Sequence, residues 1–404
     1  MALTFQIVAG ASLALAAWIW LYHIGLASVA LLTRRARCRD GGAPCHRFAI
    51  VVPAHDEEGT IEATLRCCGE IDYPADKFAV CVIADNCSDR TAEIARQHGA
   101  RCLVRTDESK RGKGFALEWA LPQILDDGYD AVVVLDADCF IDRDALRVFD
   151  ERLRGGDRVL QANDLVGNPD DSAISYLLAL GVLAANELFH APKSALGLPG
   201  MLVGSGMVIH RDVLRRFPWR SRSLCEDTEY SLLLQRHRIP IRFVREVKVV
   251  SDFPVTKEQL EVQRRRWIAG GLHSAWFYGV KLMGEGLRKG QWRLIDAGFA
   301  SVVVSRPLIL AQLFLTACLV APCAYVAPGA ASTAMLLGLG GIVVGYFAYA
   351  ALGVCLLGIS RRRFQLLLQA PLMVLRYLVV AARSALNWRA AIWERTPRLP
   401  EAAE

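Results

Sequence analysis

Two aspartates separated by one residue follow a short apolar run in this sequence of 404 residues. Asp136 and Asp138 come directly after residues 132–135, which read Val-Val-Val-Leu. If that run is a strand of an open α/β sheet, ligands bind beyond its carboxyl end. Two carboxylates there suit Mg²⁺ or Mn²⁺, which prefer oxygen ligands and often bridge to a substrate diphosphate. The alternative is that these aspartates only cap the next turn, and the pair alone leaves both interpretations open.

Other acidic side chains also follow apolar runs. Asp85 ends an earlier run, and a turn after the first run carries Asp56, Glu57 and Glu58. Asp85 is in the better ligand position because it lies at a predicted strand terminus. Some acids of the turn must instead start a helix, where they interact favourably with the macrodipole.

Three further groups of residues can serve a substrate rich in phosphate and hydroxyl groups. Glu226 and Asp227 precede an apolar-periodic stretch, and Asp227 can accept a proton from an attacking hydroxyl or merely cap a helix. Lys113 belongs to a basic, glycine-containing turn that can face a phosphate or only solvent. Residues 263–267 read Gln-Arg-Arg-Arg-Trp, which suits phosphate and sugar binding or anchoring at a membrane interface.

The elements that must position these side chains alternate between strand-like and helix-like segments from about residue 47 to 250. Continuous apolar runs are typical of parallel strands buried on both faces. The pattern therefore predicts an α/β domain with a mostly parallel sheet. Strands are expected over 48–53, 78–84 and 131–135, and helices over 61–70 and 91–98.

Composition excludes several classes of protein. The chain is 53% hydrophobic, which rules out disorder, and its 12 cysteines are too scattered for a disulfide-stapled scaffold. The formal net charge of +6 comes with no basic patch interleaved with aromatics, so nucleic acid is not an expected partner. No Asp, Glu, Lys or Arg occurs in residues 1–33 or 307–360, which indicates a membrane protein with a large aqueous domain.

Basic residues directly follow each uncharged segment and predict that both flanks are cytoplasmic. We expect a transmembrane anchor at 1–33 with its N-terminus outside, and a cytoplasmic domain at 34–266. Interfacial helices follow at 267–306, and two transmembrane helices at 307–360. Residues 361–404 form an interfacial or third membrane helix and a cytoplasmic tail. The predicted location is the inner (plasma) membrane, crossed several times.

Residues 364–386 leave two interpretations open. Arg376 and Arg383 interrupt an otherwise apolar run there. A charge at the bilayer centre costs at least a few kcal/mol, so an in-plane or tilted helix is favoured over a third C-terminal span.

Taken together, and in this order, the motifs resemble those of the membrane-integrated family 2 glycosyltransferases. That family includes cellulose, chitin-oligosaccharide and hyaluronan synthases and glucosylceramide-type enzymes. The resemblance covers residues 47–271 and implies a GT-A-type fold. It rests on Asp85, on Asp136 with Asp138, on Glu226 with Asp227, and on the QxxRW form of residues 263–267.

The resemblance also implies roles for individual residues. Asp227 would be the general base and Asp138 the metal ligand, with Mg²⁺ or Mn²⁺ as cofactor. Residues that would bind the donor are Asp56, Glu58, Asp85, Lys113, Asp136, Gly204 and Ser205; those that would bind the diphosphate and acceptor are Glu226, Gln263, Arg266 and Trp267. Residues 393–398 resemble a C-terminal signature of bacterial members, without a physical role that the sequence reveals.

The implied activity is that of an inverting, metal-dependent hexosyltransferase. It would move a hexose or N-acetylhexosamine from a UDP-sugar to a lipid or saccharide acceptor at the membrane, by single addition or processively, and as a monomer or an oligomer. The alternative hypothesis is a non-catalytic UDP-sugar sensor or a partner subunit of a polysaccharide synthase. An intact Asp227 and QxxRW form argue against it, because a sensor needs neither. A transporter has less support, because there are few spans and no acidic residue within them.

Overall fold

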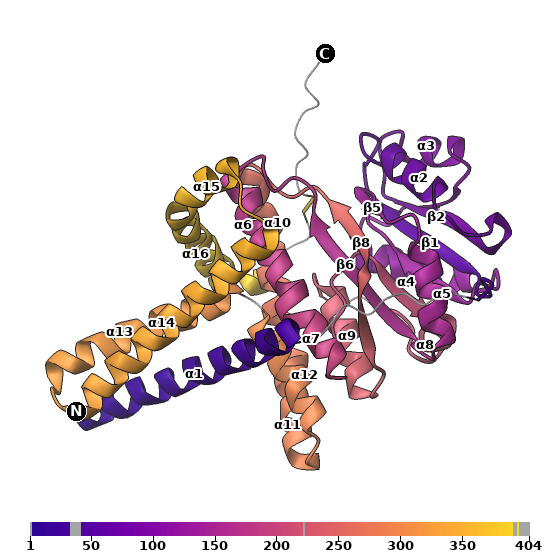
Figure 1. The fold of residues 1–404 in the computed structure, drawn as a ribbon. Helices are drawn as coiled ribbons and strands as arrows, with labels where there is room; N and C mark the ends of the chain where they lie inside the picture. The colour runs from indigo at the N-terminus through magenta and orange to yellow at the C-terminus, as the bar shows by residue number, and fades with distance from the viewer. Residues whose placement is uncertain (1, 33–41, 221–222, 305, 391–393, 396–404) are drawn as a thin grey trace.

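The computed structural model describes residues 2–32, 42–220, 223–304, 306–390 and 394–395. An α/β domain forms one side of the molecule, and a rod of long helices extends from it (Figure 1). The cysteines within the described residues are all unpaired thiols, in agreement with the absence of a disulfide framework.

A single sheet of eight strands organises the domain, in the order β3-β2-β1-β4-β7-β6-β8-β5. Only β5 and β7 run opposite to the other strands, so the predicted α/β fold with a mostly parallel sheet is confirmed. The strands are β1 Phe48–Ala54, β2 Phe78–Asp85, β3 Arg101–Arg105, β4 Ala131–Val134, β5 Cys139–Ile141, β6 Val159–Val166, β7 Met207–His210 and β8 Ile241–Ser251.

Helices cover both faces of this sheet because its strands are apolar on both sides. One face packs against α2 (Ile61–Gly69), α3 (Thr91–Gln97) and α5 (Ala145–Arg154). The opposite face packs against α4 (Lys113–Leu125), α8 (Arg211–Arg216) and α9 (Glu226–Arg236). A short 3₁₀ turn, η1 (Ala75–Lys77), leads into β2.

The strand order creates a crevice beside β1. The chain passes from β1 outward to β2 and β3, and then returns to place β4 on the other side of β1. At such a switch point the carboxyl ends of neighbouring strands diverge and leave room for a ligand. Because β7 is antiparallel to β4, the loop before Met207 meets the same edge. The crevice therefore brings Asp85, Asp136 and the Gly204–Gly206 loop to one place.

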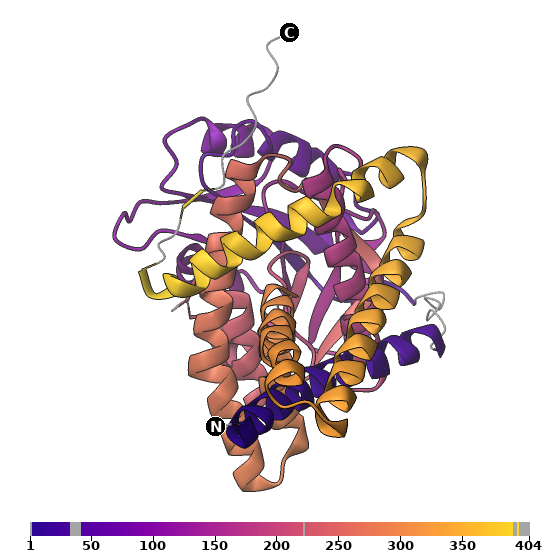
Figure 2. The same ribbon diagram turned by 90° about the vertical axis from the view of Figure 1, so that its left-hand side faces the viewer.

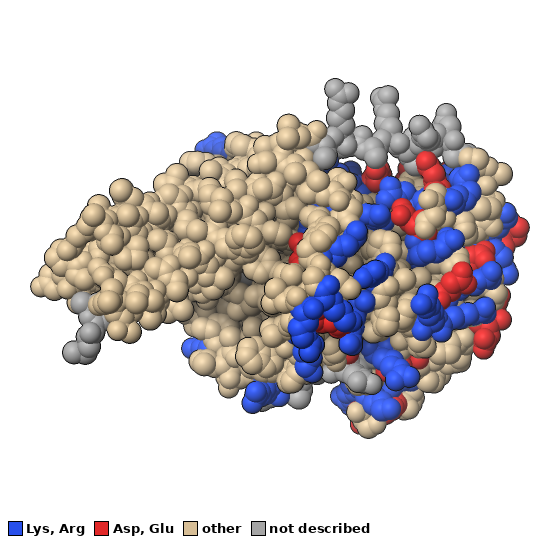
Figure 3. Space-filling model, turned by 90° about the horizontal axis from the view of Figure 1, so that it is seen from below, with Lys and Arg blue, Asp and Glu red and all other residues tan. Residues whose placement is uncertain are grey.

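Three long apolar helices form the rod: α1 (Ala2–Leu32), α13 (Arg306–Val326) and α14 (Ala330–Leu357). Each is long and apolar enough to cross a membrane. Seen from below, the rod carries no charged side chain, whereas Lys and Arg gather where it meets the α/β domain (Figure 3). This distribution agrees with the association of the chain with a membrane.

A fourth helical segment, which was not predicted from the sequence, is also long and apolar enough to cross a membrane. Residues Ala173–Ala195 comprise α6 (Ala173–Ala185), the π-helical turn η2 (Asn186–His190) and α7 (Ala191–Ala195). About 67% of its most apolar 18-residue stretch is buried inside the protein, whereas 28% of the corresponding stretch of α1 is buried. This helix packs against α1 and α14, and so it joins the rod to the α/β domain.

The remaining helices follow the sheet in the chain. They are α10 (Lys257–Ser274), the π-helical η3 (Ala275–Gly279), α11 (Val280–Lys289), α12 (Trp292–Val303), α15 (Arg361–Leu368), α16 (Ala370–Leu386) and the short η4 (Trp388–Ala390). A bend of 53° separates α15 from α16, and together the two helices have the length and apolar composition of a broken span or a re-entrant loop. Figure 2 shows α16 lying across α10, which it contacts.

A buried polar cluster fixes α1 against the domain. Lys193 on α7 lies 2.7 Å from a carboxylate oxygen of Asp296 on α12 and 2.8 Å from the hydroxyl of Tyr22 on α1. Tyr22 donates a hydrogen bond of 2.6 Å to the other carboxylate oxygen of Asp296. Because each charge is paired, the cluster holds three distant segments in one arrangement.

Asp150 on α5 ties the start of the domain to its core. One carboxylate oxygen accepts hydrogen bonds from the backbone N–H groups of Cys45 (3.1 Å) and His46 (2.8 Å) and from the Tyr73 hydroxyl (3.1 Å). Arg154 donates to the other oxygen at 2.9 Å. Although burial raises the pKa of this carboxyl, these donors outweigh it and lower the pKa to about 2.

We expect Asp150→Asn to destabilise the domain by about 3 kcal/mol, because the amide nitrogen would face donors. That loss corresponds to a fall in Tm of roughly 6–12 °C, measured by thermal unfolding of the full chain in detergent. Since the folded-state pKa is depressed, the carboxylate stabilises the fold above about pH 4 and loses this effect as pH falls toward 2. The matched control is Asp212→Asn, at an exposed helix start; an equal Tm for the two variants would contradict the prediction.

Candidate active site

A cavity of about 1180 Å³ runs from the crevice of the sheet to the long apolar helices. Its polar end is lined by the strand-end carboxylates together with residues of α4, α9 and α10. Its apolar end is lined by residues of α6, α13, α14 and α16, among them Leu178, Ile309, Tyr349 and Met373. The two ends are continuous, so a ligand can occupy both at once.

Lys113 occupies the centre of the polar end. It is the first residue of α4, and its ammonium donates to Asp136 at 2.5 Å and to the carbonyl of Gly204 at 2.6 Å. Burial lowers the pKa of Lys113, but Asp136, Glu226 and Asp227 more than offset this and raise it. Lys113 therefore stays charged and holds the DxD turn against the loop before β7.

That loop requires glycine at two positions. Gly204 has φ +97°, and a Cβ there would lie 3.4 Å from a carboxylate oxygen of Asp227. Gly206 has φ +69°, and its Cβ would lie 2.8 Å from both Ala162 and Val249. Between them, the Ser205 hydroxyl accepts a hydrogen bond of 3.1 Å from the backbone N–H of Asp136. The loop can thus pass close to the carboxylates without a side chain filling the cavity.

Asp227 and Glu226 form the first turn of α9 and line the cavity. One oxygen of Asp227 accepts a 2.6 Å hydrogen bond from the backbone N–H of Thr228. Burial raises the pKa of Asp227, and the Thr228 N–H and Lys113 counteract it. Burial and the adjacent Asp227 also raise the pKa of Glu226. A partly buried carboxylate with a raised pKa is suited to accept a proton near neutral pH.

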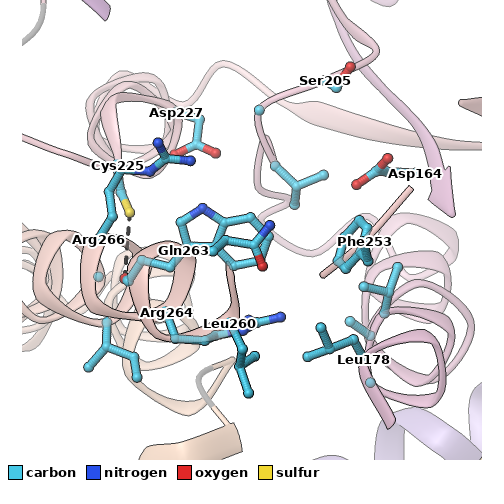
Figure 4. A pocket seen from close by; sticks show the side chains of 18 of the residues that line it. Asp164, Leu178, Ser205, Cys225, Asp227, Phe253, Leu260, Gln263, Arg264 and Arg266 are labelled. Atoms are coloured by element: carbon cyan, nitrogen blue, oxygen red, sulfur yellow. Dashed lines mark hydrogen bonds between the residues drawn. The ribbon is translucent and has the colours of Figure 1, made fainter. Parts of the chain in front are cut away.

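A third carboxylate, Asp164 on β6, lies beside Asp136 and Asp138. Burial, and then the charges of those two residues, raise the pKa of Asp164 to about 8. One oxygen of Asp164 is buried without a hydrogen-bond partner. Figure 4 shows Asp164 across the cavity from Asp227, with Gln263 between them. Such an excess of negative charge fits a divalent cation held partly by protein oxygens and partly by a diphosphate.

The other predicted acids occupy different places around the polar end. Asp85 lines the cavity and is paired with Arg105 of β3. Asp56 instead accepts hydrogen bonds from Ser88, and Glu58 from Arg90. Neither carboxylate is in the cavity lining, and donor binding by Asp56 and Glu58 stays a prediction.

Glu57, from the same turn, does line the cavity. Side chains along an irregular turn follow no fixed period, so the sequence does not show which of them faces the cavity. The choice among three neighbouring acids therefore required the structure.

Gln263, Arg266 and Trp267 of the QxxRW form lie on one helix, α10, and all three line the cavity. Arg266 lies beside Asp227, whereas Gln263 extends into the space between α10 and β6 (Figure 4). The side-chain oxygen of Gln263 is buried without a partner. Trp267 packs edge-on against Phe253 with ring centroids 6.1 Å apart. The helix thus presents an amide, a cation and an aromatic ring to a bound ligand.

Two residues near the C-terminus lie against the polar end. Arg266 donates to the carbonyl of Glu394 at 3.2 Å, and the Glu394 carboxylate pairs with Arg265. Arg395 donates to the carbonyl of Asp56 and lines the cavity. This places part of the C-terminal signature in the site; residues 393 and 396–398 of that signature lie outside the described residues. Asp164, like Glu57, lines the cavity but was not among the predicted site residues, and Arg395 was named only as part of the C-terminal signature.

Residues 46–270 match the family described as "Glycosyltransferase like family 2". The chain belongs to glycosyltransferase family 2. A beta-monoglucosyldiacylglycerol synthase from Trichormus variabilis is 28% identical over 236 residues, 55% of this chain and 48% of that protein. A poly-beta-1,6-N-acetyl-D-glucosamine synthase from Staphylococcus aureus is 26% identical over 237 residues, 55% of this chain and 54% of its own. This family 2 chain thus spans about half the length of the curated relatives it matches.

Among solved structures, this family 2 glycosyltransferase is similar to a mannosyltransferase from Pyrobaculum calidifontis, in complex with GDP-Man and Mn²⁺. The TM-score is 0.59 at 20% identity, and the match covers 95% of this chain and 99% of the other. The likeness is one of fold, and it extends over the flanking helices as well as the α/β domain. The expected GT-A-type fold is confirmed.

Proposed function

We propose that the protein is an inverting, metal-dependent glycosyltransferase that moves a hexose or N-acetylhexosamine from a UDP-sugar to a lipid-anchored acceptor. The observation that carries this proposal is the continuous cavity that joins partly buried carboxylates to the apolar helices. A soluble acceptor would need no apolar end. The names of the relatives, a glucosyldiacylglycerol synthase and a poly-N-acetylglucosamine synthase, are consistent with a membrane acceptor.

In this proposal the polar end binds the donor. Asp85 and Glu57 face the nucleoside, and Lys113 orients Asp136 toward the sugar and diphosphate. Arg266 and Arg395 approach from the other side of the cavity and offset diphosphate charge. Gly204 and Ser205 leave room for the sugar ring between Lys113 and Asp227.

Asp138 and Asp136, with Asp164 beside them, would hold Mg²⁺ or Mn²⁺. Bound there, the cation would supply charge stabilisation for the departing diphosphate. The carboxylates fit it because Asp164 lies close enough to Asp136 and Asp138 for their charges to raise its pKa. Lys113 pairs with Asp136 at 2.5 Å.

Asp227 accepts the proton of the acceptor hydroxyl as that oxygen attacks the anomeric carbon. The bond from that carbon to the diphosphate oxygen breaks, and its electron pair leaves with UDP. A single displacement from the opposite face inverts the anomeric configuration. Because Asp227 is partly buried, the proton passes to a carboxylate whose raised pKa favours acceptance.

The apolar end would hold the chains of the acceptor and keep water from the site. α6 is suited to this because it lines the cavity with Leu178 and Val182 and also contacts α14. In this arrangement α1, α13 and α14 cross the plasma membrane, and the α/β domain is cytoplasmic. Helices 267–306 and α16 then lie at the membrane interface.

The first test uses the full chain purified in lipid, with Mn²⁺ or Mg²⁺ and a panel of UDP-sugars. UDP release is measured with and without a membrane-lipid extract, and GDP-mannose serves as the nucleotide control. We expect one UDP-sugar to be consumed only when lipid is present. Release without lipid, with polymer accumulating, would show a processive synthase. UDP binding with no transfer from any donor would show a non-catalytic sensor.

A further inference from the structure

Among the described residues, basic side chains at the apolar end of the cavity have no carboxylate partners, unlike Lys113 and Arg395 at the polar end. Lys257 and Arg264 on α10 and Arg376 on α16 all line the cavity. Within the described part of the chain, none of the three has a carboxylate partner. At the polar end, by contrast, Lys113 pairs with Asp136, and Arg395 lies 3.7 Å from Glu57. Arg266, also at the polar end, donates to the carbonyl of Glu394. Lys257, Arg264 and Arg376 instead lie on the side that faces the apolar helices.

Arg264 lies at the boundary between the two ends. Its guanidinium carbon is 4.5 Å from the ring centroid of Trp267 and 5.6 Å from that of Tyr377 on α16. Its Nε is buried without a hydrogen-bond partner. Figure 4 shows the side chain extending toward Leu178 of α6, while Arg266 points toward Asp227. A guanidinium held between apolar walls with an unused donor is costly unless a ligand pairs with it.

Lys257 and Arg376 meet at a second, smaller cavity of about 360 Å³. It lies where the starts of α6, α10 and α16 come together, and it shares Ile174, Lys257, Met373 and Arg376 with the main cavity. Acidic residues occur nearby: Glu258 lines the small cavity, and Glu261 and Asp252 line the main one. Neither Glu258 nor Glu261 forms an ion pair among the described residues, so the basic side chains remain available to a ligand.

We propose that Arg264, Arg376 and Lys257 bind the phosphate of the acceptor lipid's headgroup. This rests on the proposed function and narrows its acceptor to an anionic lipid that carries both a phosphate and a hydroxyl. Guanidinium groups bind phosphate through paired hydrogen bonds, and a neutral glycerolipid would leave them unpaired. Basic residues at the edge of an apolar helix such as α16 commonly mark a ligand path. The headgroup hydroxyl then reaches Asp227 while the acyl or prenyl chains lie against α6 and α14.

Sugar transfer to this acceptor forms one bond and breaks one bond. The headgroup hydroxyl loses its proton to Asp227 and forms the new bond to the anomeric carbon. The anomeric carbon to diphosphate bond breaks, and UDP takes the electron pair. The lipid phosphate itself is unchanged, and Arg264 acts as an acceptor-binding residue and not as a catalytic one.

The test separates a total bacterial membrane-lipid extract on an anion exchanger into an acidic and a neutral fraction. Each fraction is mixed with the full chain in polyoxyethylene-ether micelles and with the radiolabelled UDP-sugar that is turned over. We expect the label to enter a lipid of the acidic fraction. Label in a neutral lipid, even if acidic lipid stimulates the reaction, would overturn the inference and leave the proposed function intact. No label in any lipid would overturn both.

Variants test the residues themselves. Arg264→Gln and Arg376→Gln are expected to raise the KM for the acidic lipid about 10- to 100-fold, because each loses a charge-assisted hydrogen bond, and to leave the donor KM within about twofold. Arg383→Gln, on the exposed side of α16, is the matched control. Wild-type KM for the lipid should also rise with salt. Unchanged lipid KM in both folded variants, or a rise equal to that of the control, would rule out the site.

Discussion

Asp227→Asn is expected to lower sugar transfer about 10³-fold, the largest single effect that we foresee. Asparagine keeps the shape of the side chain and can still accept the Thr228 N–H, so α9 and the loop around Gly204 should not move. It cannot take a proton from a hydroxyl. The loss should therefore fall on kcat, and the KM for the donor should change by less than about threefold.

The measurement is steady-state UDP release and labelled-sugar transfer, with UDP binding followed separately by calorimetry. Asp144→Asn is the matched control, since Asp144 is exposed at the start of α5 and its side chain forms no capping hydrogen bond. Wild-type kcat should fall as pH decreases through the raised pKa of Asp227, at a higher pH than for an ordinary carboxyl. Wild-type transfer by Asp227→Asn that still binds UDP would exclude Asp227 as the base.

Asp138→Asn is expected to reduce transfer by about 10²- to 10³-fold through loss of the cation. An amide oxygen is a weaker ligand than a carboxylate, and Asp136 is already engaged by Lys113. The metal concentration for half-maximal activity should therefore rise by more than about tenfold, and metal-dependent UDP binding should weaken in parallel.

The measurement for Asp138→Asn is a titration with Mn²⁺ and Mg²⁺ at fixed donor concentration, again against Asp144→Asn. Chelation of the wild-type enzyme should mimic the variant and be reversed by added metal. If Asp138→Asn loses activity with an unchanged metal requirement, Asp138 contacts the donor and does not hold the cation. If chelated wild type retains full activity, the reaction does not depend on a metal.

The sequence by itself determined the α/β domain and much of its polar cavity. Apolar runs expected over 48–53, 78–84 and 131–135 form β1, β2 and β4 with ends shifted by one residue or less. They were predictable because strands buried on both faces must be apolar throughout. Asp136 and Asp227 could be singled out because each occupies a strand or helix end, where polar side chains meet ligands.

Only the tertiary structure decided which further residues complete the site. Asp164 lies within β6, where no local pattern distinguishes it, and it reaches the DxD pair because β7 inserts antiparallel between β4 and β6. Arg395 contacts Asp56, which is 339 positions away in the chain. α6 was not recognised as a possible span, and its role as a cavity wall depends on α10, α14 and α16. Local sequence patterns record how a segment buries its own faces; contacts between distant segments depend on strand order and helix packing, which those patterns do not encode.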